Sequence, residues 1–293
     1  MHAVSINLFS LYGYCSGELL NLSVQKFEDF LKSINCECAK KKDAGDANVL
    51  KTVINFSVVV FEEKVISVVI PTIDEEASIG KVVERLKQSL REAGEEFEII
   101  VVDTNSRDRT REIAASLGCR VIVEPERGYG RAYKTGFAHA KGDIIVTLDA
   151  DASYPPEAIP ELLSVFRKEN LDFLTADRFS LMSRDVMNTT HRLGNWILNL
   201  ATLMLFNVKI NDSQSGMWIL RKDRLPELDM KSNGFPFSEE IKIKAAKRLR
   251  FKEVPIRYTT RLGEKKLNTW KDGWNNLKFL VKLRMSRELR TGK

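Results

Sequence analysis

The sequence predicts an α/β protein with a mostly parallel sheet and helices on both of its faces. Three observations predict this class. Short apolar segments alternate with amphipathic segments between Val65 and Thr175. The short segments are apolar along their whole length, which indicates strands covered on both sides. Strand and helix patterns that alternate in this way are typical of a parallel sheet joined by crossover helices.

Five strands are expected in this part of the chain, each a run of apolar and β-branched residues. The first is expected to end at Pro71, because proline cannot donate to a ladder of hydrogen bonds. The five expected strands are Val65–Ile70, Phe97–Val102, Arg120–Val123, Asp143–Leu148 and Leu171–Thr175.

Four helices are expected between these strands. Their apolar residues recur every three or four positions, as Ile79, Val82 and Leu86 do in the first of them. The expected helices are Ser78–Ala93, Arg107–Leu117, Ala132–Ala140 and Pro156–Lys168.

Beyond Asp177 the alternation stops, and this half of the chain is expected to complete the sheet. We expect two helices, two strands and a basic amphipathic end segment. In chain order these are Trp196–Phe206, Trp218–Leu220, Phe237–Leu249, Phe251–Tyr258 and Trp270–Leu289.

The charge of the chain is uneven. Its 293 residues carry a net charge of +6, and residues 241–293 hold 17 Lys and Arg against 4 Asp and Glu. Such a segment suits an anionic partner, which could be a membrane surface, a polyphosphate substrate or nucleic acid.

The sequence predicts neither a membrane-spanning helix nor a signal peptide. The most apolar stretch, residues 196–210, is too short to span a bilayer and contains Asn199, Asn207 and Lys209. It could form a core helix or lie in a membrane interface. The amino terminus has no basic n-region. The four cysteines have neither zinc nor disulfide spacing, which favours a reducing compartment.

Two carboxylates one residue apart, Asp149 and Asp151, follow the fourth predicted strand. Side chains at positions i and i+2 of an extended segment point the same way, so both can face one site. Hard oxygen ligands suit Mg²⁺ or Mn²⁺, which leave coordination positions for substrate phosphates.

Other acids follow the first and second predicted strands. They are Asp74-Glu75-Glu76 and Asp103. Because the carboxyl ends of parallel strands share one edge, we expect these acids and the Asp149–Asp151 pair to converge on one crevice. Between them, Gly128 and Gly130 precede a predicted helix, where backbone amides could approach a donor phosphate.

These motifs resemble those of family 2 glycosyltransferases, and within them the dolichyl-phosphate mannose synthase branch. The resemblance covers about Val65 to Leu267. The motifs, in order, are Pro71-Thr72-Ile73-Asp74-Glu75, Val102–Thr110, Arg127-Gly128-Tyr129-Gly130, Asp149-Ala150-Asp151 with Pro155-Pro156, Asp212-Ser213-Gln214-Ser215-Gly216, Gly234–Glu240 and Arg261–Leu267.

The resemblance implies a GT-A type nucleotide-binding sheet and a role for each matching residue. The positions that hold the nucleoside are Pro71, Glu75 and Asp103, and the ligands of the metal–diphosphate are Asp149 and Asp151. Arg178 and Arg192 match arginines expected to bind the acceptor phosphate. Arg261 and Lys266 match a basic pair that faces the diphosphate, and Asp212 and Gly216 match a segment near the donor sugar.

Four features of the motifs depart from the family pattern, the first of them a pair of residues. The usual aromatic-Asn pair is Ile73-Asp74, the second Asp after Asp103 is Thr104, a further metal-binding Gln is Ser153, and the Ser before the basic residue is Lys265. These departures leave the donor open among GDP-mannose, UDP-glucose and UDP-N-acetylglucosamine.

The expected activity is that of an inverting, metal-dependent glycosyltransferase, moving a hexose from a nucleotide-sugar to a polyprenyl (dolichyl) phosphate. A phosphate acceptor needs no general base, because it is largely dianionic at neutral pH. The alternative is a soluble family 2 enzyme acting on a sugar or protein hydroxyl, with Glu239 or Glu240 as base. A non-catalytic nucleotide-sugar-binding protein is a third, weaker hypothesis.

The resemblance also implies an organisation and a location. Residues 1–62 are interpreted as an N-terminal extension, residues 63–267 as the catalytic domain and residues 268–293 as a basic amphipathic segment. The last of these, with Trp270 and Trp274, and the Trp196–Phe206 helix are expected to seat the enzyme peripherally on the cytoplasmic face of a membrane. Nucleic acid is not an expected partner, because phosphate substrates account for the positive charge.

Overall fold

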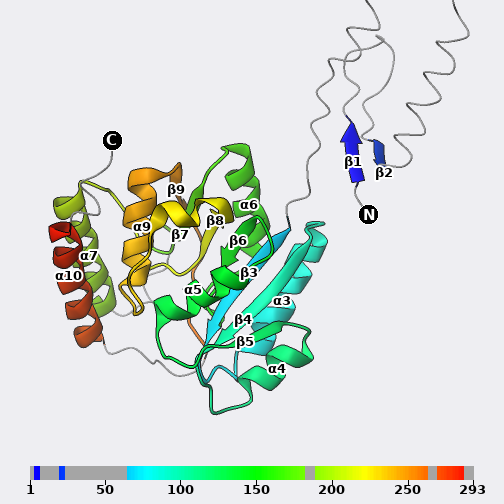
Figure 1. Ribbon diagram of the computed structural model, residues 1–293, viewed down its shortest axis with the longest axis horizontal. Helices are drawn as coiled ribbons and strands as arrows, with labels where there is room; N and C mark the ends of the chain where they lie inside the picture. Colours follow the sequence, from blue (N-terminus) through cyan, green and yellow to red (C-terminus); the bar gives the residue numbers. More distant parts are fainter. Residues whose placement is uncertain (1–2, 7–19, 24–64, 182–188, 263–268, 287–293) are drawn as a thin grey trace, which may run out of the picture. The chain divides into compact units, whose positions relative to one another are not determined.

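The computed structural model describes residues 3–6, 20–23, 65–181, 189–262 and 269–286 (Figure 1). The chain divides into two compact units, Met1–Lys64 and Val65–Lys293. In the first unit, β1 (Ala3–Ile6) pairs antiparallel with β2 (Leu20–Ser23). The second unit holds all the motifs discussed above.

The second unit is built on a sheet of seven strands in the order β5-β4-β3-β6-β8-β7-β9. Every strand is parallel to the others except β8, which runs antiparallel to both of its neighbours. The strands are β3 (Ile66–Thr72), β4 (Phe97–Asp103), β5 (Arg120–Val123), β6 (Ile144–Thr147), β7 (Phe173–Asp177), β8 (Trp218–Arg221) and β9 (Phe251–Pro255).

Helices cover both faces of this sheet, so the predicted fold class is confirmed. The α-helices are α3 (Ile79–Glu92), α4 (Thr110–Ser116), α5 (Tyr129–His139), α6 (Ile159–Lys168), α7 (Thr189–Phe206), α8 (Leu225–Leu228), α9 (Phe237–Arg248) and α10 (Thr269–Met285). Two 3-10 turns, η1 (Pro156–Ala158) and η2 (Lys222–Arg224), precede α6 and α8.

Each face of the sheet has its own apolar core. Helices α3, α4 and α6 pack on one face, with Val82, Leu86 and Phe166 fully buried. Helices α5, α8 and α9 pack on the other, around Tyr133, Trp218 and Phe237. A third cluster joins α7 and α10 to α9, and in Figure 1 these two helices lie side by side beyond the β9 end of the sheet.

Strand β3 continues through Pro71, where the sequence predicted its end. Pro71 lies opposite Val102 of β4. Pairing with β6 has already stopped at Val69 and Thr147, so no partner meets the position where a backbone N–H is missing. Strand β9, by contrast, stops at Pro255, three residues before its predicted end.

The reversed strand β8 shapes the functional edge of the sheet. The carboxyl ends of β3, β4 and β6 meet at one edge, as parallel pairing requires. Because β8 is antiparallel, its first residue, Trp218, lies at that same edge. The segment Asp212–Gly216 before β8 is therefore brought to the acids that follow the parallel strands.

A substitution at Gly136 would test the packing of α5 on the sheet. A Cβ here would overlap Val69 Cγ1 and lie 3.2 Å from Val102 Cγ2. We expect Gly136→Ala to lower the free energy of unfolding by about 1–3 kcal/mol through overpacking, measured by urea denaturation. In the matched control Gly80→Ala, the nearest atom is Ile113 Cγ2 at 3.4 Å. That variant should be neutral or gain up to about 1 kcal/mol, and equal losses in both would contradict the packing argument.

Candidate active site

Asp149 and Asp151 lie just beyond β6, at the functional edge of the sheet. Asp151 is 9% exposed, and Asp149 is half-buried. The turn after them contains Ala152 with φ of 61°, a left-handed conformation that is uncommon for a residue with a side chain. Such a backbone persists only where its surroundings hold it in place.

Asp151 is held mainly by its own loop. The Ser153 backbone N–H donates to Asp151 Oδ1 at 3.0 Å, and the Ser153 hydroxyl bonds the same oxygen. Ser153 occupies the position where the family pattern has a further metal-binding Gln. In this chain its side chain orients Asp151 instead.

Arg261 reaches the acids from a segment more than a hundred residues away in the chain. The Thr259 N–H donates to Ser153 O at 3.0 Å and the Leu262 N–H to Asp151 O at 2.8 Å, so this segment runs along the Asp151 loop. Arg261 Nη2 lies 3.6 Å from Asp151 Oδ2 and 3.8 Å from Glu75 Oε1. Its Nε is buried without a hydrogen-bond partner among the described residues.

Asp149 is contacted from behind by aromatic hydroxyls and a glycine. Tyr133 OH lies 3.3 Å from Asp149 Oδ1. A Cβ on Gly216 would lie 2.9 Å from each Asp149 carboxylate oxygen and 2.7 Å from Tyr129 OH, so only glycine fits there. Burial, and then the neighbouring Asp151 carboxylate, raise the pKa of Asp149 to about 7.

Arg178 and Asp212 form a buried bidentate ion pair beside the two acids. Arg178 Nε and Nη2 donate to Asp212 Oδ2 and Oδ1 at 2.6 and 2.8 Å, and the guanidinium carbon lies 5.2 Å from the Tyr258 ring centre. Burial alone would raise the pKa of Asp212, but the charge and hydrogen bonds of Arg178 lower it to about 2. The structure thus places Asp212 behind Arg178, as the group that fixes this arginine.

The backbone of Asp212 is fixed by two further charged side chains. Glu253 accepts its N–H at 3.1 Å, and the ammonium of the buried Lys242 donates to its carbonyl at 2.8 Å. Helix α7 adds two asparagines: Asn195 donates to Asp212 Oδ1 at 3.2 Å, and Asn199 accepts the Ser213 N–H at 3.1 Å.

The predicted nucleoside positions lie in two interlocked loops after β3 and β4. Asp103 is fully buried and accepts the Ser106 N–H at 3.0 Å. The Asp74 N–H donates to Ser106 Oγ at 2.8 Å, and Asp74 Oδ1 accepts the Arg107 N–H at 2.7 Å. Asp74 and Asn105 both have positive φ. Glu75, 9% exposed, lies between these loops and Arg261.

Gly128 and Gly130 are explained by packing against protein. A Cβ on Gly128 would overlap the Asn233 carbonyl oxygen, and one on Gly130 would lie 2.7 Å from Ser232 O and 2.6 Å from Phe237 Cβ. The Arg131 N–H donates to Asn233 O at 3.1 Å. The close approach of the 232–237 segment therefore explains why glycine occupies both positions. That their backbone amides approach a donor phosphate stays a prediction.

The two candidate bases, Glu239 and Glu240, are fully buried on α9. Glu240 is paired with Lys244 at 2.7 Å and accepts the backbone N–H groups of Lys231 and Ser232. Glu239 Oε1 accepts from Gln214 Nε2 at 2.8 Å, while its Oε2 has no hydrogen-bond partner among the described residues. Burial raises the pKa of Glu239 to about 8.

The structure therefore brings most predicted site residues to one edge of the sheet, with two exceptions. Arg192 lies on α7 and is half-buried, and within the described residues no hydrogen bond or ion pair joins it to the acids. Lys266 lies outside the described residues. Sequence reasoning missed Tyr129 and Tyr133. The predicted helix began only at Ala132, whereas α5 begins at Tyr129, so the spacing of four residues that puts both tyrosines on one face was not recognised.

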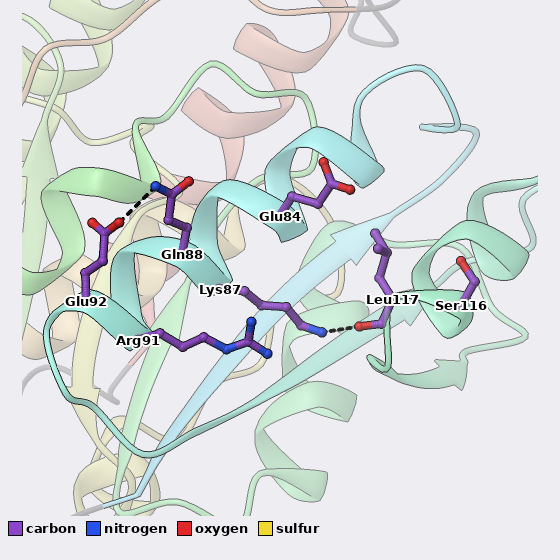
Figure 2. A pocket seen from close by; sticks show the side chains of 7 residues that line it. All are labelled: Glu84, Lys87, Gln88, Arg91, Glu92, Ser116 and Leu117. Carbon is purple, nitrogen blue, oxygen red and sulfur yellow. Dashed lines mark hydrogen bonds between the residues drawn. The ribbon is translucent and has the colours of Figure 1, made fainter.

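A surface hollow of about 540 Å³ lies elsewhere, between α3 and α4 (Figure 2). In it, Lys87 donates to the Leu117 carbonyl at the carboxyl end of α4. That bond satisfies a helix-terminal carbonyl. The hollow contains none of the site residues named above, so it is not the candidate active site.

The residues present fit a divalent cation such as Mg²⁺ or Mn²⁺. Asp149 and Asp151 supply hard oxygen ligands, and their mutual repulsion would be relieved by a bound cation. No cluster of three or more His, Cys, Asp or Glu side chains that could hold a metal occurs in the described part of the chain. The protein would thus supply two ligands and leave the remaining positions to a diphosphate.

Comparison with known proteins agrees with this geometry. The sequence model of glycosyl transferase family 2 matches residues 67–228, more than half of the chain. The chain belongs to this family. It is therefore a glycosyltransferase, and the acids after β3, β4 and β6 lie within the matched region.

Two relatives of this glycosyltransferase come from Haloferax volcanii. A low-salt glycan biosynthesis hexosyltransferase, Agl6, is 34% identical over 74% of the chain, which spans only 53% of that protein. A dolichyl-phosphate hexose transferase is 31% identical over 77% of the chain, and here the match covers 96% of the relative.

Solved structures show that the fold is GT-A. Glucosyl-3-phosphoglycerate synthase from Mycobacterium tuberculosis, in complex with Mn²⁺, uridine diphosphate and glucosyl-3-phosphoglycerate, superposes with a TM-score of 0.59. The match covers 78% of this chain and 81% of that one at 21% identity, so the likeness concerns the fold alone.

Replacing Glu239 by Gln would test its buried, neutral state. Its folded pKa of about 8 exceeds the ordinary value of 4.5, so the folded protein holds a proton that the unfolded chain releases between these two pH values. The Glu239 contribution to stability is present below pH 4.5 and is lost as the pH rises to 8. We therefore compare the melting temperatures of the two proteins at each pH. The value for Glu239→Gln minus the value for the parent should increase by about 2 °C or more as the pH rises from 5 to 8.

Comparing the two proteins at each pH cancels the titration of the shared groups that do not interact with Glu239. Lys242, whose charge lowers the pKa of Glu239, is not among them. The same experiment on Glu240→Gln provides a control, because Glu240 is paired with Lys244. That variant should lose stability at every pH. A melting difference for Glu239→Gln that does not change with pH would show that Glu239 is ionised in the folded protein.

Proposed function

We propose that this glycosyltransferase is inverting and metal-dependent, and that it moves a hexose from a nucleotide-sugar to a polyprenyl (dolichyl) phosphate. The resemblance to a dolichyl-phosphate hexose transferase over nearly the whole of that relative supports the acceptor class. GDP-mannose, UDP-glucose and UDP-N-acetylglucosamine are the donors to be tested.

The observation that carries the proposal is that both candidate bases are buried. A cation held in place, Arg178, lies beside Asp149 and Asp151 instead. A hydroxyl acceptor needs a base within hydrogen-bond reach. Glu240 is paired with Lys244, and Glu239, whose pKa burial raises to about 8, accepts a hydrogen bond from Gln214. A phosphate monoester has already lost its protons and needs a cation instead.

Arg178 is suited to that role. Asp212 accepts hydrogen bonds from Nε and Nη2 of Arg178, and these bonds fix the guanidinium plane. Arg178 is also close enough to lower the pKa of Asp149. Its Nη1 is the nitrogen that Asp212 does not use. An acceptor phosphate placed there would lie beside the donor diphosphate, and an arginine fixed in advance loses little side-chain entropy on binding.

Each group then has one task in the transfer. Glu75, Asp103 and Pro71 form the wall for the nucleoside, and Arg261 lies where the diphosphate would carry its charge. A phosphate oxygen of the acceptor attacks the anomeric carbon from the face opposite the diphosphate, the carbon–oxygen bond to the diphosphate breaks, and the configuration inverts. Arg261 would stabilise the charge that grows on the departing oxygen. A cation held by Asp149 and Asp151 would supply Lewis-acid stabilisation of the same leaving group.

Helices α7 and α10 provide a surface for the lipid. On α7, Trp196 and Met204 are 60% and 77% exposed, and on α10 Trp274 is 58% exposed, so the packed pair presents large apolar side chains to the outside. Exposed lysines and arginines of α10, among them Lys278 and Lys282, accompany them. We propose that this face seats the enzyme peripherally on the cytoplasmic leaflet. Within the described residues, no helix has the length and apolarity needed to cross a bilayer.

Transfer of labelled sugar into organic-extractable lipid tests the reaction. Purified protein would receive Mn²⁺, a polyprenyl phosphate and each radiolabelled donor in turn. We expect one donor to label the lipid, EDTA to abolish the labelling, and Asp151→Ala to reduce it at least about 100-fold, the equivalent of roughly 3 kcal/mol in the barrier. Asp223→Ala is the matched control, because Asp223 is exposed just after the opposite end of β8.

Two outcomes would contradict this reaction. Label that appears only in water-soluble products would favour a hydroxyl acceptor, above all if Glu239→Gln abolished it. Label in lipid that persists fully in EDTA would overturn the metal dependence and leave the acceptor standing.

Flotation with acceptor-free liposomes tests the membrane surface. Because exposed apolar side chains and basic residues act together, we expect binding to anionic vesicles, weaker binding at high salt, and about 10-fold or more weaker binding of Trp196→Ser/Met204→Ser. The control Val123→Thr changes a side chain that is 49% exposed on edge strand β5. Unaltered binding of the double variant would exclude α7 from the membrane contact.

A further inference from the structure

Tyr133 of α5 is the hydrogen-bond donor nearest to Asp149. Its hydroxyl lies 3.3 Å from Asp149 Oδ1 and 3.4 Å from the Gly216 carbonyl oxygen. The side chain is fully buried. No role for this residue is predicted from the sequence. Within the described part of the chain, no other hydrogen bond to the Asp149 carboxylate is present.

The ring of Tyr133 is fixed by its neighbours. The centres of the Tyr129 and Trp218 rings both lie 4.9 Å away, and the Phe237 ring is stacked at 6.0 Å. Phe137 closes another side at 5.8 Å. A ring surrounded in this way cannot swing to another rotamer without displacing a core side chain. The hydroxyl is therefore held at one point behind Asp149.

Two other groups compete for the Tyr133 proton, the Gly216 carbonyl and the Tyr129 hydroxyl. The carbonyl already has a closer donor. Thr147 Oγ1 donates to Gly216 O at 2.7 Å. A phenol has a single proton to donate. Because a carboxylate accepts more strongly than a neutral phenol or a carbonyl that is already bonded, the proton of Tyr133 is directed to Asp149 Oδ1.

Asp149 also lacks the local support that Asp151 has. Asp151 is oriented by the backbone and hydroxyl of Ser153, two residues along its own loop. Asp149 is confined instead by Gly216, which precedes β8, and by Tyr133 on α5. Its rotamer therefore depends on elements that are distant in the sequence.

We infer that Tyr133 is a positioning residue, whose hydroxyl binds Asp149 Oδ1 and fixes the carboxylate in the orientation from which it would bind the cation. This inference rests on the proposed metal-dependent transfer. Groups that orient a metal ligand from behind commonly change metal affinity about 10- to 100-fold when they are removed.

Tyr133→Phe is the direct test, because phenylalanine keeps the ring in its aromatic surroundings and removes only the hydroxyl. Mn²⁺ would be titrated into the full-length protein with UDP and, separately, with GDP, followed by electron paramagnetic resonance of the free ion. We expect about 10- to 100-fold weaker Mn²⁺ affinity. The Mn²⁺ concentration at half-maximal transfer should rise by a similar factor, while the rate at saturating Mn²⁺ changes far less.

Tyr154→Phe is the matched control. Tyr154 is also buried, and its hydroxyl accepts the Gly216 N–H at 2.7 Å and makes no hydrogen bond to Asp149. We expect this variant to lose thermal stability and to keep most of its Mn²⁺ affinity. Asp149→Asn gives the affinity that remains when the ligand itself is impaired.

Three results would overturn the inference: unchanged Mn²⁺ affinity in a folded Tyr133→Phe protein, equal losses in both phenylalanine variants, or a parent protein that binds no Mn²⁺ with either nucleotide. The titration requires no acceptor. A parent protein that binds Mn²⁺ but labels no polyprenyl phosphate would therefore refute the proposed acceptor and leave the role of Tyr133 decided by the titration alone.

Discussion

The two carboxylates that follow β6 impose the constraint on which the rest of the site depends. Asp149 and Asp151 lie close together in a partly buried position, where like charges repel strongly. The cationic side chains nearest to them, Arg178 and Arg261, come from after β7 and β9. Asp212 holds the side chain of Arg178, and backbone hydrogen bonds to the Asp151 loop hold the segment that carries Arg261, so positive charge opposes the acids before any substrate arrives. Such preorganisation is what makes electrostatic stabilisation effective.

Reversal of a single strand makes this arrangement possible. If β8 were parallel to its neighbours, the segment before it would lie at the opposite edge of the sheet. Because β8 is antiparallel, Asp212 meets Arg178 and Gly216 meets Asp149 at the functional edge. The GT-A sheet thus gathers its site from loops after parallel strands and from one loop before an antiparallel strand.

The sequence predicted those features of the structure that depend on residues close to one another in the chain. Buried strands are recognised in the sequence as apolar runs. The side chains of Asp149 and Asp151 point the same way because they are two residues apart on an extended segment. The pairing of Arg178 with Asp212 has no such signal, since it depends on the direction of β8. Gly128 and Gly130 show the reverse case: glycines before a helix fit a phosphate loop as well as a close chain crossing. The position of the 232–237 segment accounts for the close chain crossing, and contact with a phosphate stays a prediction.

The helix pair α7 and α10 connects the proposed lipid surface to the charged site. The outer face of α7 carries Trp196 and Met204, whereas Asn195 and Asn199 on its inner side bond the 211–213 segment. From α10, Asn276 donates to the side chain of Gln214 at 3.2 Å. The segment that fixes Arg178 and supplies Gly216 is therefore held directly by the helices that would meet the membrane. An acceptor whose phosphate lies at the edge of a bilayer would meet both parts at once, whereas a water-soluble acceptor would give the exposed apolar face no role in the reaction.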